Sequence, residues 1–283
     1  ALGPAVRYQS AQAAALLGRT DVELRALAEV ARDHEEAALR AEAEFRLGEN
    51  AFTNGAWTQA RSHYEAALAQ APTGWLRTNS AYMLGWSHLK LLRNADAWSA
   101  LARALDSVLL PPGAEAPRAV DDLPRADREL LDDTRRALLL SLGETAPVDT
   151  LGDRIRDAAL ERHASLLHRD LVDRFVQLER FADAVAASEG YLALAPLAED
   201  AEAFSARIIA LWETAGFPGS AWQAREQYVT DYGPDGPYAQ RHGLARQAER
   251  LLAFLDQLSQ RDHYAAQESG DPGDYAAAAD WYE

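Results

Sequence analysis

The chain has 283 residues, with 28 Lys and Arg against 44 Asp and Glu, which gives a formal net charge of −16. This negative charge argues against a nucleic-acid backbone or an anionic membrane surface as the main partner. The sequence contains no cysteine, which excludes disulfides, zinc–thiolate sites, iron–sulfur clusters and cysteine nucleophiles. No segment approaches the roughly 20 consecutive apolar residues of a membrane-spanning helix, so no transmembrane segment is expected.

Residues 1–40 are predicted to form helices. Alanine is abundant whereas Ile and Val are few, and this composition favours helix over strand throughout the chain. Thr20 and Asp21 are expected to cap the helix that contains VELRALAEVARDH, because their side-chain oxygens can accept hydrogen bonds from free backbone N–H groups. We interpret this segment as a degenerate helix pair.

Residues 41–110 contain two similar units, which begin at Ala41 and Thr78. Each unit has Leu-Gly in a first helix, then a small, a large and a small residue in a second helix, and a closing proline. These positions are Leu47, Gly48, Ala60, Tyr64, Ala67 and Pro72 in the first unit, and Leu84, Gly85, Ala97, Leu101, Ala104 and Pro111 in the second. Glycine lets a second helix approach closely, and alternating small and large residues let antiparallel helices interlock.

Residues 111–163 are expected to interrupt this array. The segment from Pro111 to Pro124 contains four prolines and no hydrophobic periodicity. Structureless loops of this length are usually functional or mobile. Two helices are predicted after it, from Arg125 to about Leu142 and from Thr150 to Ala159. We interpret the whole segment as an insertion of a proline-rich loop and extra helices.

Residues 164–233 repeat the pattern with different residues, as two degenerate pairs. The corresponding positions are Leu171, Val172, Phe175, Phe181, Ala184, Ser188, Tyr191 and Pro196, and then Ile208, Ile209, Trp212, Gly216, Ala221, Arg225 and Tyr228. Residues 234–283 are predicted to be a partial unit, in which Tyr275, Ala278 and Tyr282 take second-helix positions. Because the chain opens with Ala1 and stops inside a helix pair, we expect it to be part of a longer protein.

These units resemble the tetratricopeptide repeat, a helix–turn–helix motif of about 34 residues. The resemblance extends from Ala41 to Glu283 and is strongest in the first two units. It implies an all-α superhelical solenoid of stacked antiparallel helix pairs. The segments SAYMLGWSHLKL, ERFADAVAASEGYLALAP and DYAAAADWYE also make the chain similar to large tetratricopeptide lipoproteins of Gram-negative cell envelopes. That similarity implies a periplasmic protein, which in a full-length form would be an outer-membrane lipoprotein.

The resemblance also implies which residues face a partner, because tetratricopeptide arrays bind along a concave groove lined by their first helices. Transferred to this sequence, the candidate binding residues are Phe45, Glu49, Phe52, Asn79, Tyr82, Trp86, Lys90, Arg169 and Asp173. Aromatic anchors dominate many interfaces, so the aromatic run is the strongest part of this site. The alternative is that these aromatic residues pack between helices. Co-chaperone repeats hold a peptide carboxylate with Lys and Asn at some of these positions, and the residues present here disfavour that ligand.

No catalytic or metal site is predicted. His163 and His168 are five residues apart, whereas metal-binding histidines on one helix face are three or four apart. Both are therefore expected to be solvated or to lie at helix ends. Adjacent carboxylates such as Asp132 and Asp133 point about 100° apart on a helix and do not face each other. The chain has neither a phosphate-binding glycine loop nor a Gly-x-Ser-x-Gly elbow, and GDPGD and GPDGP are interpreted as turns. We expect no enzyme, no cofactor and no metal.

The sequence thus predicts a non-enzymatic protein–protein interaction scaffold, or adaptor, of a bacterial cell envelope. Its partners would be other proteins, and the stacked pairs would present an extended surface to a segment of one of them. The absence of cysteine fits a periplasmic location. The alternative is a carbohydrate-binding or assembly module of a polysaccharide-export apparatus, because aromatic rings beside Asn79 and Glu49 suit sugar rings.

Overall fold

A computed structural model describes residues 3–33, 36–71, 74–111, 113–143 and 147–281 of the chain. Over these residues the fold is all-α: no strand is present, and consecutive helices pack against one another in pairs, as predicted. The chain separates into two compact units. Unit 1 consists of Ala1–Pro147 and Arg154–Arg162, and unit 2 consists of Val148–Asp153 and His163–Glu283.

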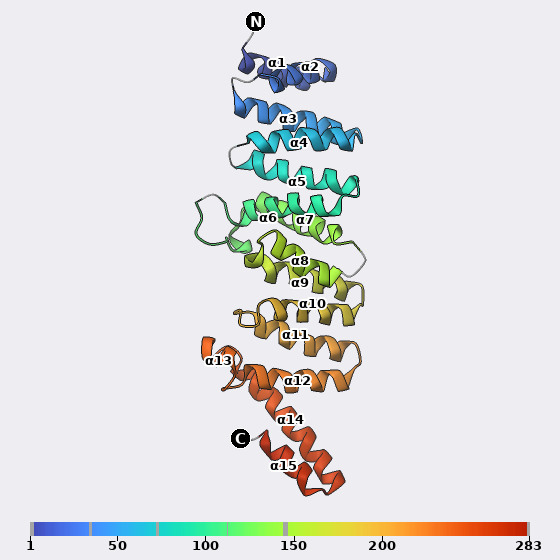
Figure 1. Cartoon of the computed structure of the whole chain (residues 1–283), viewed down its shortest axis with the longest axis vertical. Coiled ribbons are helices and arrows are strands. Elements are labelled where there is room, and N and C mark those ends of the chain that lie inside the picture. Colours follow the sequence, from blue (N-terminus) through green and yellow to red (C-terminus); the bar gives the residue numbers. More distant parts are fainter. Residues whose placement is uncertain (1–2, 34–35, 72–73, 112, 144–146, 282–283) are drawn as a thin grey trace. The chain divides into compact units, whose positions relative to one another are not determined.

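Unit 1 is built from the helices α1 (Pro4–Leu16), α2 (Thr20–Ala31), α3 (Ala37–Thr53), α4 (Trp57–Gln70), α5 (Trp75–Lys90), α6 (Asn94–Leu109) and α7 (Arg125–Ser141) (Figure 1). Each helix packs on the next in this series. In addition α1 contacts α3, α3 contacts α5 and α5 contacts α7, whereas no comparable contact joins α2, α4 and α6 within the described part of unit 1. The odd-numbered helices therefore form a closely packed row, which we call the inner row.

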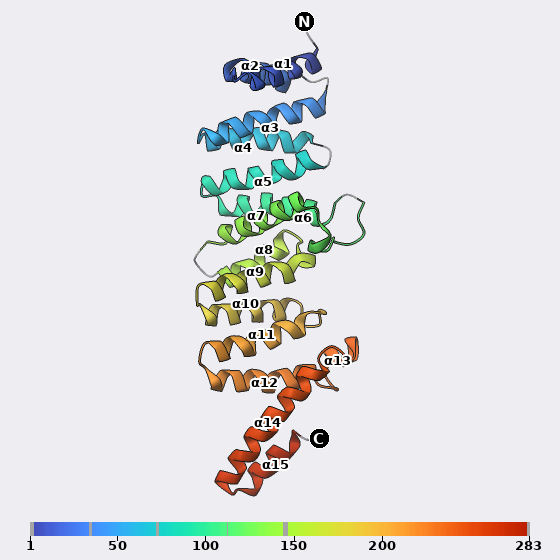
Figure 2. The same ribbon diagram turned by 180° about the vertical axis from the view of Figure 1, so that it is seen from behind.

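Unit 2 contains α9 (Ala164–Gln177), α10 (Phe181–Leu194), α11 (Ala201–Thr214), α12 (Pro218–Tyr232), α13 (Pro237–His242), α14 (Ala248–Ser269) and α15 (Pro272–Asp280) (Figure 2). Helices α9 to α12 pack in succession, α14 packs on α12, and α15 packs on α14. The core is rich in tyrosine: the rings of Tyr228 and Tyr238 each lie 4.9 Å from that of Tyr232, measured between centroids. Helix α8 (Pro147–Asp157) is divided between the units.

The predicted interlock of small and large residues is confirmed in both clear pairs. A Cβ atom added to Gly48 would lie 2.7 Å from Tyr64 Cε1, and one added to Gly85 would lie 2.4 Å from Leu101 Cγ. The alanines of the second helices, Ala60, Ala67, Ala97 and Ala104, are fully buried. The paired helices therefore approach closely because these positions carry little or no side chain. Pro72, the predicted end of the first unit, lies outside the described residues.

One turn geometry recurs after the first helix of a pair. The second residue beyond the helix is left-handed; these residues are Gly18, Gly55, Leu92, Glu179 and Gly216, with φ from 55° to 77°. Ala159 (φ 53°) has the same conformation after α8. The residue that follows donates its backbone N–H to the carbonyl five residues earlier, as Arg93 does to His88 at 2.9 Å. This is a Schellman closure, which satisfies free carbonyls at a helix end. The repeat is thus visible in the backbone even where its sequence has diverged.

Helix α7 belongs to the inner row although residues 111–163 were expected to form an insertion. It packs on α6 and contacts α5, as α5 packs on α4 and contacts α3, and Gly143 beyond it has the same left-handed conformation (φ 75°). What departs from the pair pattern is the segment before Arg125. There the Arg118 N–H donates to the Leu109 carbonyl at 2.8 Å, a 3-10 helix spans Val120–Asp122, and Leu123 is buried.

Two predicted helix starts are wrong. The helix expected to be capped by Thr20 and Asp21 begins at Thr20 itself, so Arg19 takes the cap position and no side chain caps the helix. Asp21 instead lies in the first turn, where a carboxylate interacts favourably with the helix dipole. The helix expected from Thr150 begins at Pro147, a residue whose fixed φ suits the first helical position. In the C-terminal unit Ala278 is buried, and Tyr282 lies outside the described residues.

Candidate functional site

The strongest part of the candidate site is a stripe on α5. Tyr82 and Trp86 lie one helical turn apart, with ring centroids 6.4 Å apart and ring planes at 80°. Both side chains are partly exposed. Burial raises the pKa of the Tyr82 hydroxyl, the neighbouring Trp86 indole N–H counteracts part of this shift, and the charges of Asp133 and Arg136 on α7 also act on it. The stripe therefore lies beside α7, within the inner row.

The indole Nε1 of Trp86 is covered and makes no hydrogen bond of standard geometry among the described residues, although its N–H lies near enough to the Tyr82 hydroxyl to act on the pKa of that group. A covered donor without an acceptor is energetically unfavourable, typically by about 1–3 kcal/mol. Because this nitrogen is covered, an oxygen of a ligand could reach it only after a neighbouring side chain had moved. The exposed part of the Trp86 side chain is therefore available for apolar contact.

Helix α7 supplies residues that the sequence analysis did not select. Arg136 pairs with Asp133 at 2.9 Å, and Leu140, one turn later, is 44% exposed. These side chains follow one face of α7 at spacings of three and four residues. Sequence reasoning missed them because the helix was assigned to an insertion. We call Tyr82, Trp86, Asp133, Arg136 and Leu140 the inner-row patch.

Phe45 and Phe52 differ in their surroundings. Phe45 is only 3% exposed, and its ring lies 5.6 Å from Tyr64 and 5.3 Å from Trp75 between centroids. It therefore packs between helices, which is the alternative considered for the aromatic run. Phe52 is partly exposed and lies edge-on to Trp57, with centroids 4.8 Å apart.

The three polar candidate residues of unit 1 make local contacts. Lys90 Nζ lies 5.7 Å from the centre of the Trp57 ring, a cation–π contact that places Lys90 with Phe52 at the turn end of the helices. Glu49 pairs with Arg46 at 2.9 Å, and Asn79 Nδ2 donates to the Trp75 carbonyl at 3.0 Å. The structure thus brings Phe52 and Lys90 together at this turn end, and Tyr82 and Trp86 together at the inner-row patch. Phe45, Glu49 and Asn79 belong to neither group.

Arg169 and Asp173 belong to unit 2 and serve contacts between its helices. Arg169 pairs with Asp200 at 3.2 Å, and Asp173 pairs with Arg207. Burial by itself would raise the pKa of Asp200, but hydrogen bonds from Ser165 and Tyr191, together with the Arg169 charge, outweigh it and lower that pKa. Both residues are therefore engaged with neighbouring helices of unit 2.

His163 lies at a helix end, the N-cap position of α9, which is one of the two expected placements, whereas His168 is neither solvated nor at a helix end. Their exposed fractions are 3% and 1%. His168 Nδ1 lies 2.9 Å from the Ala187 carbonyl, and burial lowers the pKa of His168. Among the described residues no three His, Asp or Glu side chains are grouped so as to hold a metal ion. No helix in the described part of the chain has both the length and the apolar character needed to cross a membrane.

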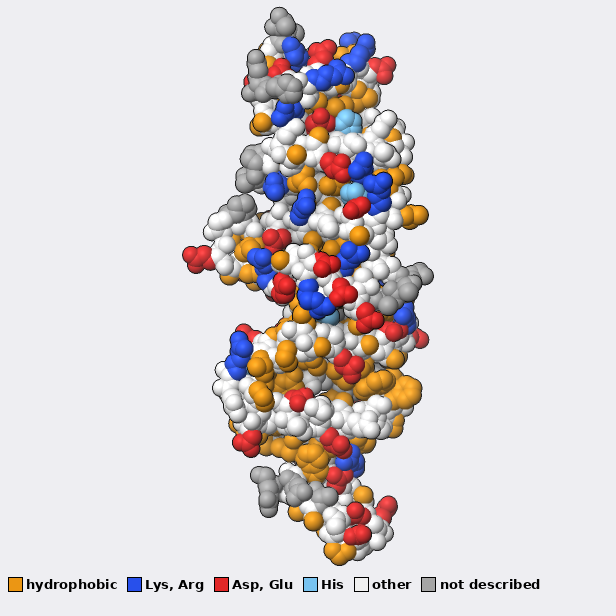
Figure 3. Space-filling view, viewed as in Figure 1, with side chains coloured by type: hydrophobic (Ala, Val, Ile, Leu, Met, Phe, Trp, Pro, Cys, Tyr) orange, Lys and Arg blue, Asp and Glu red, His pale blue; other side chains and the backbone are white. Residues whose placement is uncertain are grey.

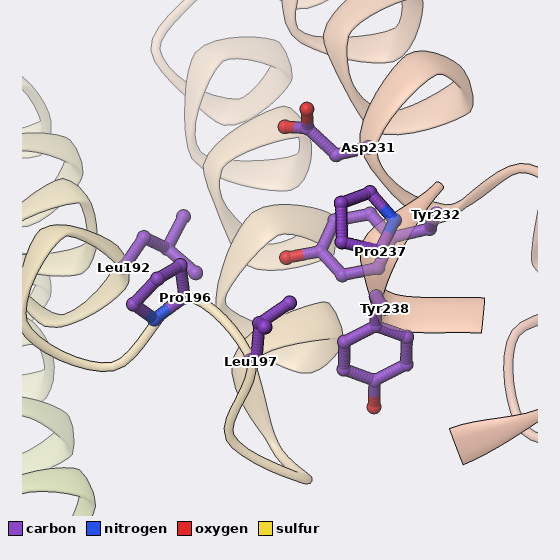
Figure 4. Close-up of a pocket in the computed structure, with 7 residues that line it drawn as sticks. All are labelled: Leu192, Pro196, Leu197, Asp231, Tyr232, Pro237 and Tyr238. Carbon is purple, nitrogen blue, oxygen red and sulfur yellow. The ribbon is translucent and has the colours of Figure 1, made fainter. Parts of the chain in front are cut away.

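A pocket of about 260 Å³ lies in unit 2, where hydrophobic side chains gather over α10 to α12 (Figure 3). It is lined by Leu192, Pro196, Leu197, Asp231, Tyr232, Pro237 and Tyr238 (Figure 4). Residues 233–237 were expected only to form a turn. A signal that could have indicated the pocket is the pair of tyrosines, Tyr232 and Tyr238, that flank this turn and are both buried.

No protein-family model matches this chain, and no curated protein matches it. A functional proposal therefore depends on the residues and geometry described above.

Proposed function

We propose that this protein is a non-enzymatic scaffold of the tetratricopeptide type, which binds a segment of a partner protein on the inner-row patch of unit 1. The observation that carries the proposal is the α5 stripe, where two partly exposed aromatic rings lie beside a charged pair and an exposed leucine on α7. Apolar anchors with a few directed polar groups are typical of peptide-binding surfaces.

The repeat type and the cell compartment are part of the same proposal. The close approach at Gly48 and Gly85 and the recurring left-handed turn support the tetratricopeptide assignment, since both features place antiparallel helices in register. The similarity to envelope lipoproteins and the absence of cysteine support a periplasmic location in a Gram-negative bacterium.

Site-specific photo-crosslinking tests the proposal. A photo-reactive residue replaces Arg136 in the inner-row patch, and in a control it replaces Leu92, which is 87% exposed in a turn. In cells that express the native gene, we expect the first position to capture a discrete envelope protein and the second to capture none. Equal capture at both positions, or capture from the cytosol, contradicts the proposal.

Trp86→Ala measures the contribution of the stripe. It should weaken binding of the captured partner by about 2 kcal/mol or more, roughly 30-fold, as truncation of interface aromatic anchors does. Tyr264→Ala is the matched control, because Tyr264 is 65% exposed on α14 of unit 2. A loss of about 3–5 kcal/mol of stability in Trp86→Ala, without a change in binding, would show that Trp86 is a core residue.

The carbohydrate-binding alternative rests on the same stripe, since partly exposed Tyr and Trp rings also stack on sugar rings. It predicts that a purified envelope polysaccharide protects tryptophan fluorescence from quenching in the wild-type chain more than in Trp86→Phe, since the chain has seven tryptophans. It also predicts that no protein is captured at Arg136.

A further inference from the structure

The pocket of unit 2 is formed by the ends of two helix pairs. Leu192 comes from the end of α10, Pro196 and Leu197 from the α10–α11 connection, and Asp231 from the end of α12. Figure 4 shows Leu192 and Pro196 on one side of the space and Pro237 with Tyr232 on the other. Leu197 closes the lower side, and the Asp231 side chain stands at the upper edge.

The wall between Asp231 and Pro237 is held by a tight turn. A Cβ atom on Gly236 would lie 2.5 Å from the Asp231 carbonyl oxygen, and one on Gly233 would lie 2.6 Å from the Val229 carbonyl oxygen. Neither position therefore accepts a side chain without movement of the backbone. Beyond the turn, the Tyr238 hydroxyl donates to the Glu199 carbonyl at 2.6 Å, which fixes the floor of the pocket. The pocket is thus a pre-formed feature of unit 2.

The charge at the pocket is negative and unbalanced. Asp231 is exposed, and its Oδ1 accepts a hydrogen bond from Gln227 Nε2 at 2.8 Å, but no basic side chain of the described residues pairs with it. Two arginines of the following segment have partners, since Arg246 pairs with Glu199 and Arg250 with Glu202. His242, whose ring lies 4.7 Å from that of Tyr238, has its Nε2 2.9 Å from the Leu197 carbonyl oxygen. A cation at the rim would therefore meet an unpaired carboxylate.

The size of the pocket indicates what kind of cation fits. About 260 Å³ is below the roughly 300–1,000 Å³ that is typical of sites for small organic ligands. The lining is apolar and aromatic except at Asp231. A long alkyl stem with one charged end matches this arrangement, because its stem replaces water on the apolar walls while its charge stays at the rim.

We propose that this pocket binds a single Lys or Arg side chain of a partner protein, with the alkyl stem between Pro196 and Pro237 and the cationic group at Asp231. This inference rests on the proposed scaffold function, because the Lys or Arg side chain in the pocket would belong to a partner protein. It concerns unit 2 alone, and no residue of the inner-row patch of unit 1 takes part in it.

The test uses small probes, so it does not require the partner. The blocked amino acids N-acetyl-lysine-N-methylamide and N-acetyl-norleucine-N-methylamide are titrated into the isotope-labelled full chain, and the amide resonances of Leu197 and Gly233 are followed. The lysine probe should shift both resonances saturably, and the norleucine probe, which lacks the charge, should bind at least about fivefold more weakly. Equal binding of the two probes overturns the proposal, because the site would then be an apolar crevice.

Asp231→Asn should weaken binding of the lysine probe by about fivefold, which is near the upper end of what exposed ion pairs contribute to binding. Asp256→Asn is the matched control, since Asp256 is exposed on α14 and also accepts from a glutamine one turn away, Gln260, at 2.8 Å. Equal effects of the two variants overturn the proposal. Saturable binding of pentylamine combined with no binding of the blocked lysine also overturns it, because the occupant would then be a free amine. Thermal melts show whether each variant is folded.

Capture at Arg136 tests the scaffold function separately, so the two proposals can fail independently.

Discussion

At the scale of single residues, two glycines set the distance between paired helices. Gly48 and Gly85 occupy equivalent positions in the first helices of two pairs, and each lies against the large residue of the second helix. An added methyl group would overlap that neighbour, Tyr64 in one pair and Leu101 in the other. Packing in protein interiors tolerates such overlap poorly, because neighbouring atoms already fill the space.

Gly85→Ala should therefore lower the free energy of unfolding by about 1–3 kcal/mol, in spite of the higher helix propensity of alanine. Gly219→Ala on α12 is the control, since no atom lies within 4 Å of its added Cβ; its effect should stay within about 0.5 kcal/mol. Urea unfolding measures the free energy of unfolding of both variants. Leu101→Ala removes the neighbour, so the double variant should cost less than the sum of the two single changes. Strict additivity would show that the contact with Leu101 is not the cause.

The buried His168 makes stability depend on pH. Burial lowers its pKa in the folded state, so on acidification below about 6.5, the usual pKa of histidine, the unfolded chain takes up a proton first. The free energy of unfolding should fall as the pH drops through this range, and His168→Leu should reduce that dependence. His263→Leu is the control, because His263 is exposed. Urea unfolding at several pH values between about 5 and 7.5 provides the comparison. An unchanged pH dependence in His168→Leu would contradict this explanation.

At the scale of elements, the left-handed turn after the first helix identifies the repeat. Glycine adopts this conformation without strain, and three of the turns use Gly18, Gly55 and Gly216. Leu92 and Glu179 adopt it as well, although a residue with Cβ is disfavoured there. The stacked helices on either side thus impose the turn even where the local sequence opposes it.

Leu92→Gly should raise the free energy of unfolding by up to about 1 kcal/mol, because the strain of φ 57° disappears and little burial is lost at 87% exposure. Leu91→Gly is the matched control: its φ of −92° is ordinary, so glycine there should destabilise by roughly 0.5–1 kcal/mol. Chemical denaturation of both variants gives the comparison. Effects of the same sign would contradict the assignment of strain to Leu92.

At the scale of the whole molecule, stability depends on contacts between neighbouring helices. No set of His, Asp and Glu side chains in the described part of the chain is arranged as a metal site, and the sequence offers no disulfide. A chelator should therefore leave the melting temperature unchanged, as followed by the helical circular dichroism signal. A fall of several degrees that zinc or calcium reverses would reveal a metal site.

The sequence determined the helical class, the position of most helices and the interlock within the two clear pairs. These features depend on composition and on spacing within one helix or between adjacent helices, so they can be deduced from Leu84, Gly85 and Leu101 without a structure. The exact helix starts at Thr20 and Pro147 could not be deduced in this way. Several residues near a helix end can be helical or non-helical at similar free energy.

Only the tertiary structure decided which surfaces are available. Phe45 and Tyr82 occupy equivalent positions in two repeats, yet Phe45 is buried against Trp75 whereas Tyr82 is partly exposed beside α7. Helix α7 and the turn before Pro237 both contact residues that are far away in the chain. Which residues they contact depends on how whole helices pack. Periodicity within one helix shows which of its faces is apolar, but what covers that face depends on the position of the neighbouring helices.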